Sequence, residues 1–171
     1  MSKGQGYLSR VKLGPRGLRL FMNFWPPFRG MGAHVARIAD DFSEADVELR
    51  MRLLNRNFVG THFGGSMFAM TDPFFMVLMM QRLGPDYVVW DKAGAIRFIK
   101  PGRGTLKAQV RVTPEMVAEA KERTANGEKF EPTYTVELKD PEGVVVARVE
   151  KTLHIRKKKL GSESRASQHR L

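Results

Sequence analysis

Apolar residues occupy every second position from Val47 to Leu53, and the residues between them are Glu or Arg. A period of two is typical of a β-strand that buries one face and exposes the other. Residues 34–38 lie just before this segment, across the polar turn Asp40-Asp41. We therefore expect them to form the antiparallel neighbour of the first strand.

The second half of the chain continues as short segments separated by turn signals. β-Branched, aromatic or alternating residues predict strands over 87–100, 105–112, 134–138 and 144–155. A short polar helix should interrupt them, with Thr113 as its N-cap and Pro114 as its first residue. Residues 140–143, Asp-Pro-Glu-Gly, predict a hairpin turn before the last strand.

The segment from about 64 to 83 is apolar on nearly every side, which predicts a long helix at the centre of the domain. One sheet covers only one face of such a helix, so the exposed helix flank and the sheet edge favour dimerisation. A different interpretation stays open, in which Asp72 is the N-cap of a helix that starts at Pro73. Residues 64–66 would then be a loop.

Charge divides the chain of 171 residues into three parts. Residues 1–29 contain six Lys or Arg and no acid, 156–171 contain six and one Glu, and the charges between them balance, although the whole chain carries +11. We expect a basic lead-in with a short helix over 1–29, one domain over 30–156, and a disordered tail over 157–171.

The location of this charge bears on the partners of the protein. A neutral body argues against a nucleic-acid-binding fold, which would carry its basic residues on a face of the domain. The basic ends are either solvated tails or a means of attraction to an acidic partner. The short helix, which Trp25-Pro26-Pro27 should end in a turn, either packs on its own domain or lies on a membrane surface.

Several kinds of chemistry lack the residues they need. The chain has no cysteine, which excludes disulfides, thiolate zinc sites and cysteine nucleophiles. Its four histidines do not have metal-ligand spacing, and we expect neither a metal nor a cofactor. No secretory signal or membrane span is apparent, so we expect a cytoplasmic protein.

Asp72 is the only ionisable residue in the most apolar segment, Met67 to Met80. Burying a lone carboxylate is costly unless it is paired, hydrated or used in a reaction. The pair Gly64-Gly65 at the start of the same segment leaves backbone N–H groups able to face a ligand oxygen. Together these features predict a site that polarises a carbonyl and handles a water or a nucleophile.

The spacing of Asn57, Gly60, Gly64-Gly65 and Asp72 resembles the helix motif of one group of acyl-CoA thioesterases, the phenylacetyl-CoA-thioesterase-like branch of the hotdog-fold superfamily. The segment Ala95–Pro101 and the following Gly104 resemble that branch as well. The resemblance covers roughly 30–155, and the particular residues within it are similar to those of a subgroup of unassigned function. It implies an α+β hotdog fold, in which a curved antiparallel sheet wraps around a long central helix.

The resemblance also implies catalytic roles. The Gly65 N–H would polarise the thioester carbonyl. Asp72, reaching in from the partner subunit, would act as general base or nucleophile. Asn57 would help to position the water or the thioester, Asp91 would orient the water, and His62 would complete the catalytic set.

The same resemblance implies a substrate and an assembly. Gly64 and Phe63 would contact the substrate, and Arg97, Lys100 and Arg103 would meet the phosphates of coenzyme A, which enters as part of an acyl-CoA. The substrate is an acyl-CoA or acyl-carrier thioester. Two hotdog subunits would form a dimer with shared active sites, and dimers would assemble into a tetramer.

One position departs from the motif of that branch. Its histidine stands directly before the glycine pair, where this chain has Phe63, and His62 comes one residue early. Three hypotheses stay open. The chain is a thioesterase, a binding protein that keeps an acyl pocket without the chemistry, or an interaction module whose basic tails recruit an acidic surface.

Overall fold

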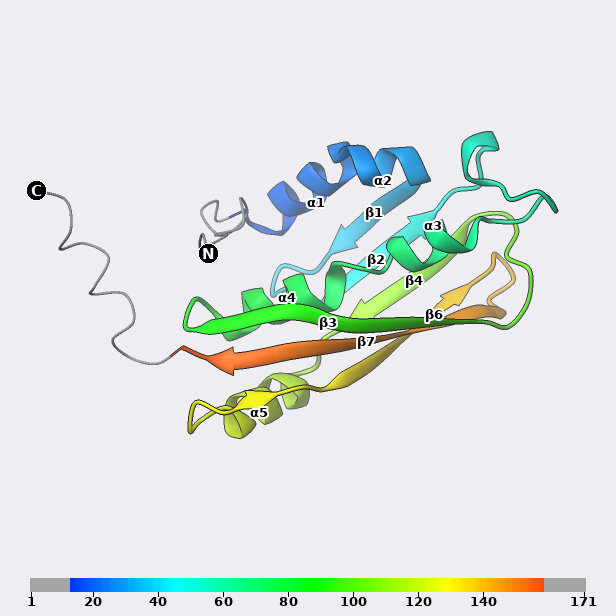
Figure 1. Ribbon diagram of the computed structural model, residues 1–171. Coiled ribbons are helices and arrows are strands. Elements are labelled where there is room, and N and C mark those ends of the chain that lie inside the picture. Colours follow the sequence, from blue (N-terminus) through cyan, green and yellow to red (C-terminus); the bar gives the residue numbers. More distant parts are fainter. Residues whose placement is uncertain (1–12, 159–171) are drawn as a thin grey trace, which may run out of the picture.

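The computed structural model describes residues 13–158, which form one curved sheet and a set of helices (Figure 1). The strands are β1 Ala33–Ile38, β2 Glu44–Leu49, β3 Tyr87–Phe98, β4 Leu106–Arg111, β5 Lys129–Phe130, β6 Thr133–Lys139 and β7 Val145–Lys157. The helices are α1 Pro15–Phe24, α2 Pro26–Met31, the 3-10 helix η2 Leu53–Asn55, α3 Gly64–Ala69, α4 Phe74–Leu83 and α5 Pro114–Arg123. The predicted tail beyond 158 lies outside the described residues.

The sheet is antiparallel, in the order β1-β2-β4-β6-β7-β3, and the short β5 pairs with β7. The predicted strands are thus confirmed, except that β2 ends at Leu49, four residues before the alternation does. β3 is the terminal strand of this order, so one edge of this twelve-residue strand has no neighbour among the described residues. This open edge runs beside the central helices.

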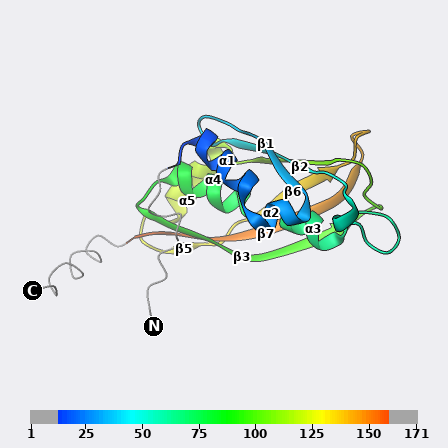
Figure 2. The same cartoon turned by 90° about the horizontal axis from the view of Figure 1, so that it is seen from above.

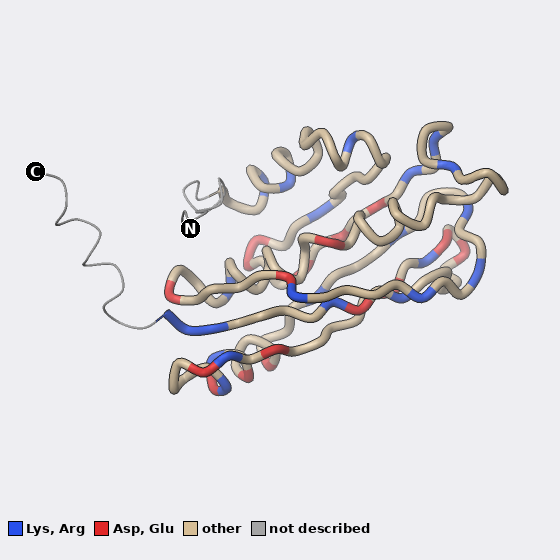
Figure 3. Tube along the Cα trace, viewed as in Figure 1, with Lys and Arg blue, Asp and Glu red and all other residues tan. Residues whose placement is uncertain are grey.

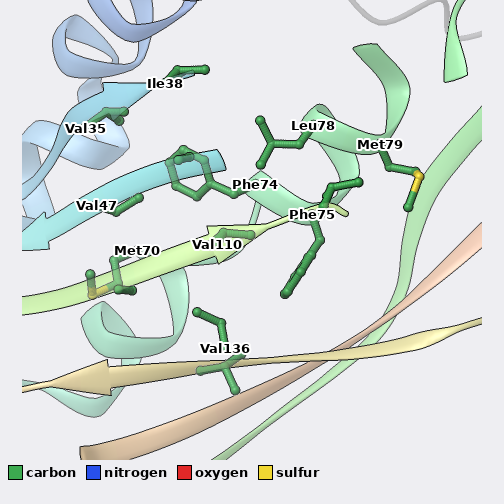
Figure 4. Packing of buried hydrophobic residues seen from close by; sticks show 14 of the residues in the cluster. Val35, Ile38, Val47, Met70, Phe74, Phe75, Leu78, Met79, Val110 and Val136 are labelled. Atoms are coloured by element: carbon green, nitrogen blue, oxygen red, sulfur yellow. The ribbon is translucent and has the colours of Figure 1, made fainter. Parts of the chain in front are cut away.

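The central helical segment lies inside the curve of the sheet, where α4 contacts β3, β4 and β7 (Figures 1 and 2). Phe74, Leu78 and Met79 of α4 are buried in the core, towards which β-strand valines project (Figure 4). This confirms the layout expected from the sequence, an α+β fold with a curved antiparallel sheet around a central helical segment.

A turn over residues 70–73 divides that segment into α3 and α4. Pro73 has no N–H to donate and crowds the preceding turn, which is why the helix is interrupted here. The two interpretations of the sequence are each correct in part. The glycine pair is helical and not a loop, while α4 does begin directly after Pro73, with no side-chain cap from Asp72.

The prolines after Trp25 begin a second helix, which the sequence analysis did not predict. Proline is favoured at the first helical positions, and Pro26 and Pro27 occupy those of α2. Leu18 and Met22 of α1 are buried in the core, so α1 packs on its own domain. Within 13–158 no helix combines the length and apolar content that crossing a membrane requires.

Candidate active site

Asp72 lies in the turn between α3 and α4, and about half of its side chain is exposed (52%). Lys151 of β7 donates a hydrogen bond from Nζ to Oδ1 of Asp72 at 2.6 Å. The carboxylate is therefore held through one of its oxygens, and it lies in a turn at the surface of the domain. An exposed, charged carboxylate in a fixed position is a group that can take a proton from a water molecule.

Lys151 is buried, with only 3% of its side chain exposed, and it lies between two carboxylates. The second is Asp91 of β3, whose Oδ1 is 3.4 Å from Nζ. That contact is an ion pair without hydrogen-bond geometry, and Oδ1 of Asp91 has no hydrogen-bond partner in the described part of the chain. The ring of Phe68 closes the site from the helix side, with its centroid 5.4 Å from Nζ.

The pKa of Asp91 is raised above its usual value, chiefly because the carboxyl is removed from water. Lys151 acts in the opposite direction and lowers this pKa, while the charge of Asp72 raises it further. The three residues come from β3, β7 and the turn after α3, so the fold assembles them from distant parts of the sequence. We call Asp72, Asp91 and Lys151 the charged cluster.

The other end of α3 borders a groove of about 400 Å³. It is lined by Asn57, Thr61, His62, Gly64, Met67 and residues 98–102. We call it the glycine groove. Two of the predicted catalytic residues, Asn57 and His62, and the predicted substrate-binding residues Gly64 and Lys100 thus meet at one place, whereas Asp72 and Asp91 lie in the charged cluster.

His62 is buried, and its Nε2–H donates to the carbonyl oxygen of Gly104 at 2.7 Å. A carbonyl can only accept, which places the proton of the neutral ring on Nε2 and leaves Nδ1 as an acceptor with no partner in the described residues. Burial lowers the pKa of His62. The histidine is therefore neutral at pH 7 and attached to the chain segment that follows β3.

Asn57 uses both ends of its side chain within its own loop. Its Nδ2 donates to Oγ1 of Thr61 at 2.8 Å, and its Oδ1 accepts from the backbone N–H groups of Val59 and Thr61 at 3.1 and 3.0 Å. These bonds fix the turn that contains Gly60, at φ +75°. Asn57 therefore shapes the loop before the groove.

Aromatic rings explain why both helix-opening residues are glycines. A Cβ on Gly65 would lie 2.4 Å from the Phe63 ring, and one on Gly64 would lie 2.7 Å from the Phe98 ring. Phe63 is 57% exposed and makes no cap for α3. Phe63, the predicted substrate contact, thus has its ring against the position that a Gly65 side chain would occupy, and it is not among the residues that line the groove.

The predicted phosphate-binding cations are not gathered into one cluster. Lys100 forms an ion pair with Asp140 at 2.6 Å, and Arg103 donates to the carbonyl of Gly60 at 3.2 Å. Arg97 is on β3 opposite Arg148 of β7, directly before Phe98, but it is not itself among the residues that line the groove. No group of three His, Asp or Glu side chains in 13–158 has the arrangement of a metal site.

Lys151 and Phe98 are the site residues that the sequence analysis missed. Lys151 occupies a buried position in the alternation of β7, between Val149 and Leu153, which are both buried. A lysine at an inward-facing position of a strand could have identified Lys151 from the sequence, because a buried lysine requires a buried counter-charge. The contact of Phe98 with Gly64 has no comparable signal, since it depends on how β3 crosses the start of α3.

α3 separates the charged cluster from the start of the glycine groove. It has six residues, so it is about 9 Å long at 1.5 Å per residue. No hydrogen bond or ion pair found in the described residues joins Asp72 to His62 or Asn57. Within one chain, the two groups are half-sites at opposite ends of one helix.

Comparison with known proteins identifies a family and a fold. A domain of unknown function (DUF4442) is the family whose model matches residues 17–155. No curated protein sequence matches the chain.

Solved structures with the same architecture include a Pseudomonas aeruginosa protein of unknown function designated a probable thioesterase, at TM-score 0.74 and 18% identity over 84% of this chain and 96% of that one. A Haemophilus influenzae thioesterase has TM-score 0.62 and 9% identity, over 86% and 93%. The Escherichia coli PaaI protein, from the phenylacetic acid degradation operon, has TM-score 0.58 and 17% identity, over 81% and 90%. These likenesses confirm the hotdog fold, and the family match confirms the expected subgroup of unassigned function.

Proposed function

This chain belongs to the DUF4442 family, and we propose that it hydrolyses an acyl thioester by attack of a water molecule that Asp72 activates. The observation that carries the proposal is the half-exposed carboxylate of Asp72, held by one oxygen in a bend beside the central helix. Its second oxygen is available to accept a proton from water. The likeness of the fold to structures designated as thioesterases supports the reaction class.

The proposed reaction proceeds in two steps. Asp72 takes a proton from water, and the resulting hydroxide adds to the carbonyl carbon of the thioester. The backbone N–H of Gly65 donates to the oxygen that becomes negative. When the carbon–sulfur bond breaks, the proton on Asp72 passes to the leaving thiolate, which yields a carboxylic acid and a thiol and returns the carboxylate to its initial state.

Two copies of the chain are needed to bring these groups together. Gly65 and Asp72 lie at opposite ends of α3, and we propose that Gly65 of one chain works with Asp72 of the partner subunit. The open edge of β3 supports this arrangement, because its unpaired backbone groups can continue the sheet into a second copy. Ala93, Gly94 and Ala95 on this strand are exposed. Assembly of two such dimers gives the proposed tetramer.

The cations near the groove favour a coenzyme A thioester. Lys100 lines the glycine groove and Arg103 bonds to the loop that shapes it. In the proposed complex Arg103 and Lys100 donate to the phosphates, and Lys100 exchanges its ion pair with Asp140 to do so. Arg97 precedes the groove residue Phe98 but does not line the groove, and we assign it no role in the chemistry.

The test is thiol release from short, medium, long and aromatic acyl-CoAs, with the wild type beside Asp72→Asn. We expect turnover by the wild type and its loss in the variant. Asp86→Asn, which alters an exposed residue in the turn before β3, is the matched control and should keep wild-type turnover. An Asp72→Asn protein that is as active as the wild type would contradict the proposed role of Asp72.

One observation favours a second candidate, an acyl-CoA-binding protein without catalysis. Phe63 occupies the position where the phenylacetyl-CoA-thioesterase-like branch has its histidine, and His62, although it lines the groove, uses its Nε2–H to bond to Gly104. Tight binding of acyl-CoA by the wild type and by Asp72→Asn, with no thiol release from either, would support this candidate over the first.

A further inference from the structure

Lys151 is more deeply buried than either of its acidic partners. Its side chain is 3% exposed, against 22% for Asp91 and 52% for Asp72. Removing an ammonium group from water costs several kcal/mol unless close anions compensate it. A surface lysine that happened to meet Asp72 would keep its own contact with water, so the burial of Lys151 needs a reason of its own.

The surroundings of Lys151 are built to hold an extended lysine. Gly94 is its partner on β3, and a Cβ there would lie 3.2 Å from Cδ of Lys151 and 2.8 Å from the Phe68 ring. The absence of a side chain at Gly94 thus makes room for both. Phe68 then covers the ammonium, and Asp91 provides a negative charge on the sheet side.

The other neighbours of Lys151 leave its charge directed at Asp72. Tyr134 of β6 is its partner on the opposite strand, so the two side chains share one face of the sheet. Burial raises the pKa of Tyr134 to about 12, so its hydroxyl stays neutral through the range of enzyme assays. Asp72 and Asp91 are therefore the acidic partners of Lys151 among the described residues.

We propose that Lys151 is a positioning residue for Asp72, holding its carboxylate by one oxygen so that the second oxygen faces the substrate. Asp91 is the fixed counter-charge that keeps the lysine in place when Asp72 receives a proton during the reaction. This inference rests on the proposed function for its catalytic consequence. The pairing itself can be tested without any activity.

The catalytic test compares kcat and KM of the wild type, Lys151→Met and Lys151→Arg. Loss of the ammonium removes the donor that holds the Asp72 carboxylate, so kcat of Lys151→Met should fall about tenfold while KM stays near its wild-type value. Lys151→Arg keeps a charged donor and should recover part of kcat.

Lys139→Met is the matched control, because Lys139 is an exposed residue of β6 with side-chain exposure of 51%. It should leave both constants unchanged. A loss of kcat in both Lys151 variants that matches their loss of folded protein would overturn the positioning role and leave Lys151 with a purely structural one.

The second measurement is the ¹⁵N-NMR signal of lysine ammonium groups in the whole protein. We expect one slowly exchanging signal that Lys151→Met removes, and we expect Asp72→Asn and Asp91→Asn each to shift it. If Asp72→Asn leaves the position of this signal unchanged, the proposal is overturned, whatever the activity of the protein. If the wild type hydrolyses no thioester but the signal responds to Asp72, the proposed function fails while the pairing stands.

Discussion

The two ends of α3 are built by different physical means. At its C-terminal end, the charged cluster holds three ionisable side chains from three distant segments, with a buried lysine in the middle. At its N-terminal end, the glycine groove is formed by backbone, rings and a neutral histidine. Opposite charges elsewhere in the body are interspersed along the surface strands and turns (Figure 3).

This difference separates what each end can contribute to a reaction. In the proposed reaction the charged cluster accepts and returns a proton, with Asp91 as a second acidic partner of Lys151. The glycine groove can donate backbone N–H groups at the start of α3. It leaves no room for side chains at positions 64 and 65, because the rings of Phe63 and Phe98 lie against the two glycines. Substitutions at the two ends should therefore affect different measured quantities.

The largest effect should come from Asp72→Asn. We expect kcat on acyl-CoA to fall about 10³-fold, since this substitution removes the general base while keeping the shape of the side chain. The thermal midpoint should change little, because the side chain is half-exposed. Thiol release and a thermal melt on the same preparation measure both. A matching loss of kcat and of folded protein would contradict this separation.

The next largest effect should come from Lys151→Ala, which should lower the free energy of unfolding by about 3 kcal/mol at pH 7. Without Lys151, the pKa of Asp91 rises further above that of the unfolded chain, so folded protein binds a proton more readily. The free energy of unfolding of the variant then falls as the pH rises from the pKa of the unfolded carboxyl through the higher pKa of Asp91 in the folded protein. The difference in stability between variant and wild type should therefore be smaller at pH 4 than at pH 7. Urea unfolding at both pH values, with Lys139→Ala as control, measures this.

His62→Gln addresses the other end of α3 and should lower the free energy of unfolding by about 1 kcal/mol at pH 7.5. The pKa of His62 is lowered in the folded state, so the unfolded chain binds the proton first as the pH falls through 6.5. The wild type should therefore lose stability between pH 7.5 and 5.5, and the variant should lose less. Equal acid sensitivity of the two proteins in urea titrations would count against this role of the histidine.

Gly65→Ala should reduce kcat/KM about tenfold without reducing stability. The added Cβ meets the exposed Phe63 ring at 2.4 Å and pushes the ring across the N–H that would face the substrate. The double variant Gly65→Ala/Phe63→Ala should recover much of the loss, because no ring is left to displace. A double variant as impaired as Gly65→Ala would show that the backbone, and not the ring, is responsible.

The smallest effect should come from Arg103→Ala, which should raise KM for acyl-CoA by about threefold at low salt through loss of a phosphate contact. The same acyl group on N-acetylcysteamine, which lacks the phosphates, should show no change. An equal rise in KM for both substrates would mean that Arg103 acts through the loop at Gly60, to which it is bonded.

Sequence reasoning found the glycine groove more completely than the charged cluster. Asn57, His62 and Gly64 lie within eight residues, so a local motif contains them, and hydrophobic alternation located most strands. Lys151 is 79 residues from Asp72, and only the register of β7 against β3 brings it there. The division of the central helix also depended on a single residue, Pro73. The apolar pattern continues through this proline, and whether the helix breaks there is decided by packing.

The open edge of β3 has a consequence for the newly made chain. In a single chain, β3 presents an edge with no strand partner among the described residues, and an extended polypeptide can join the backbone donors and acceptors there. Lys92 and Arg97 are exposed on this strand, and their charge disfavours such pairing. In the proposed dimer a second copy covers this edge, so the yield of intact protein should depend on how quickly copies meet after synthesis.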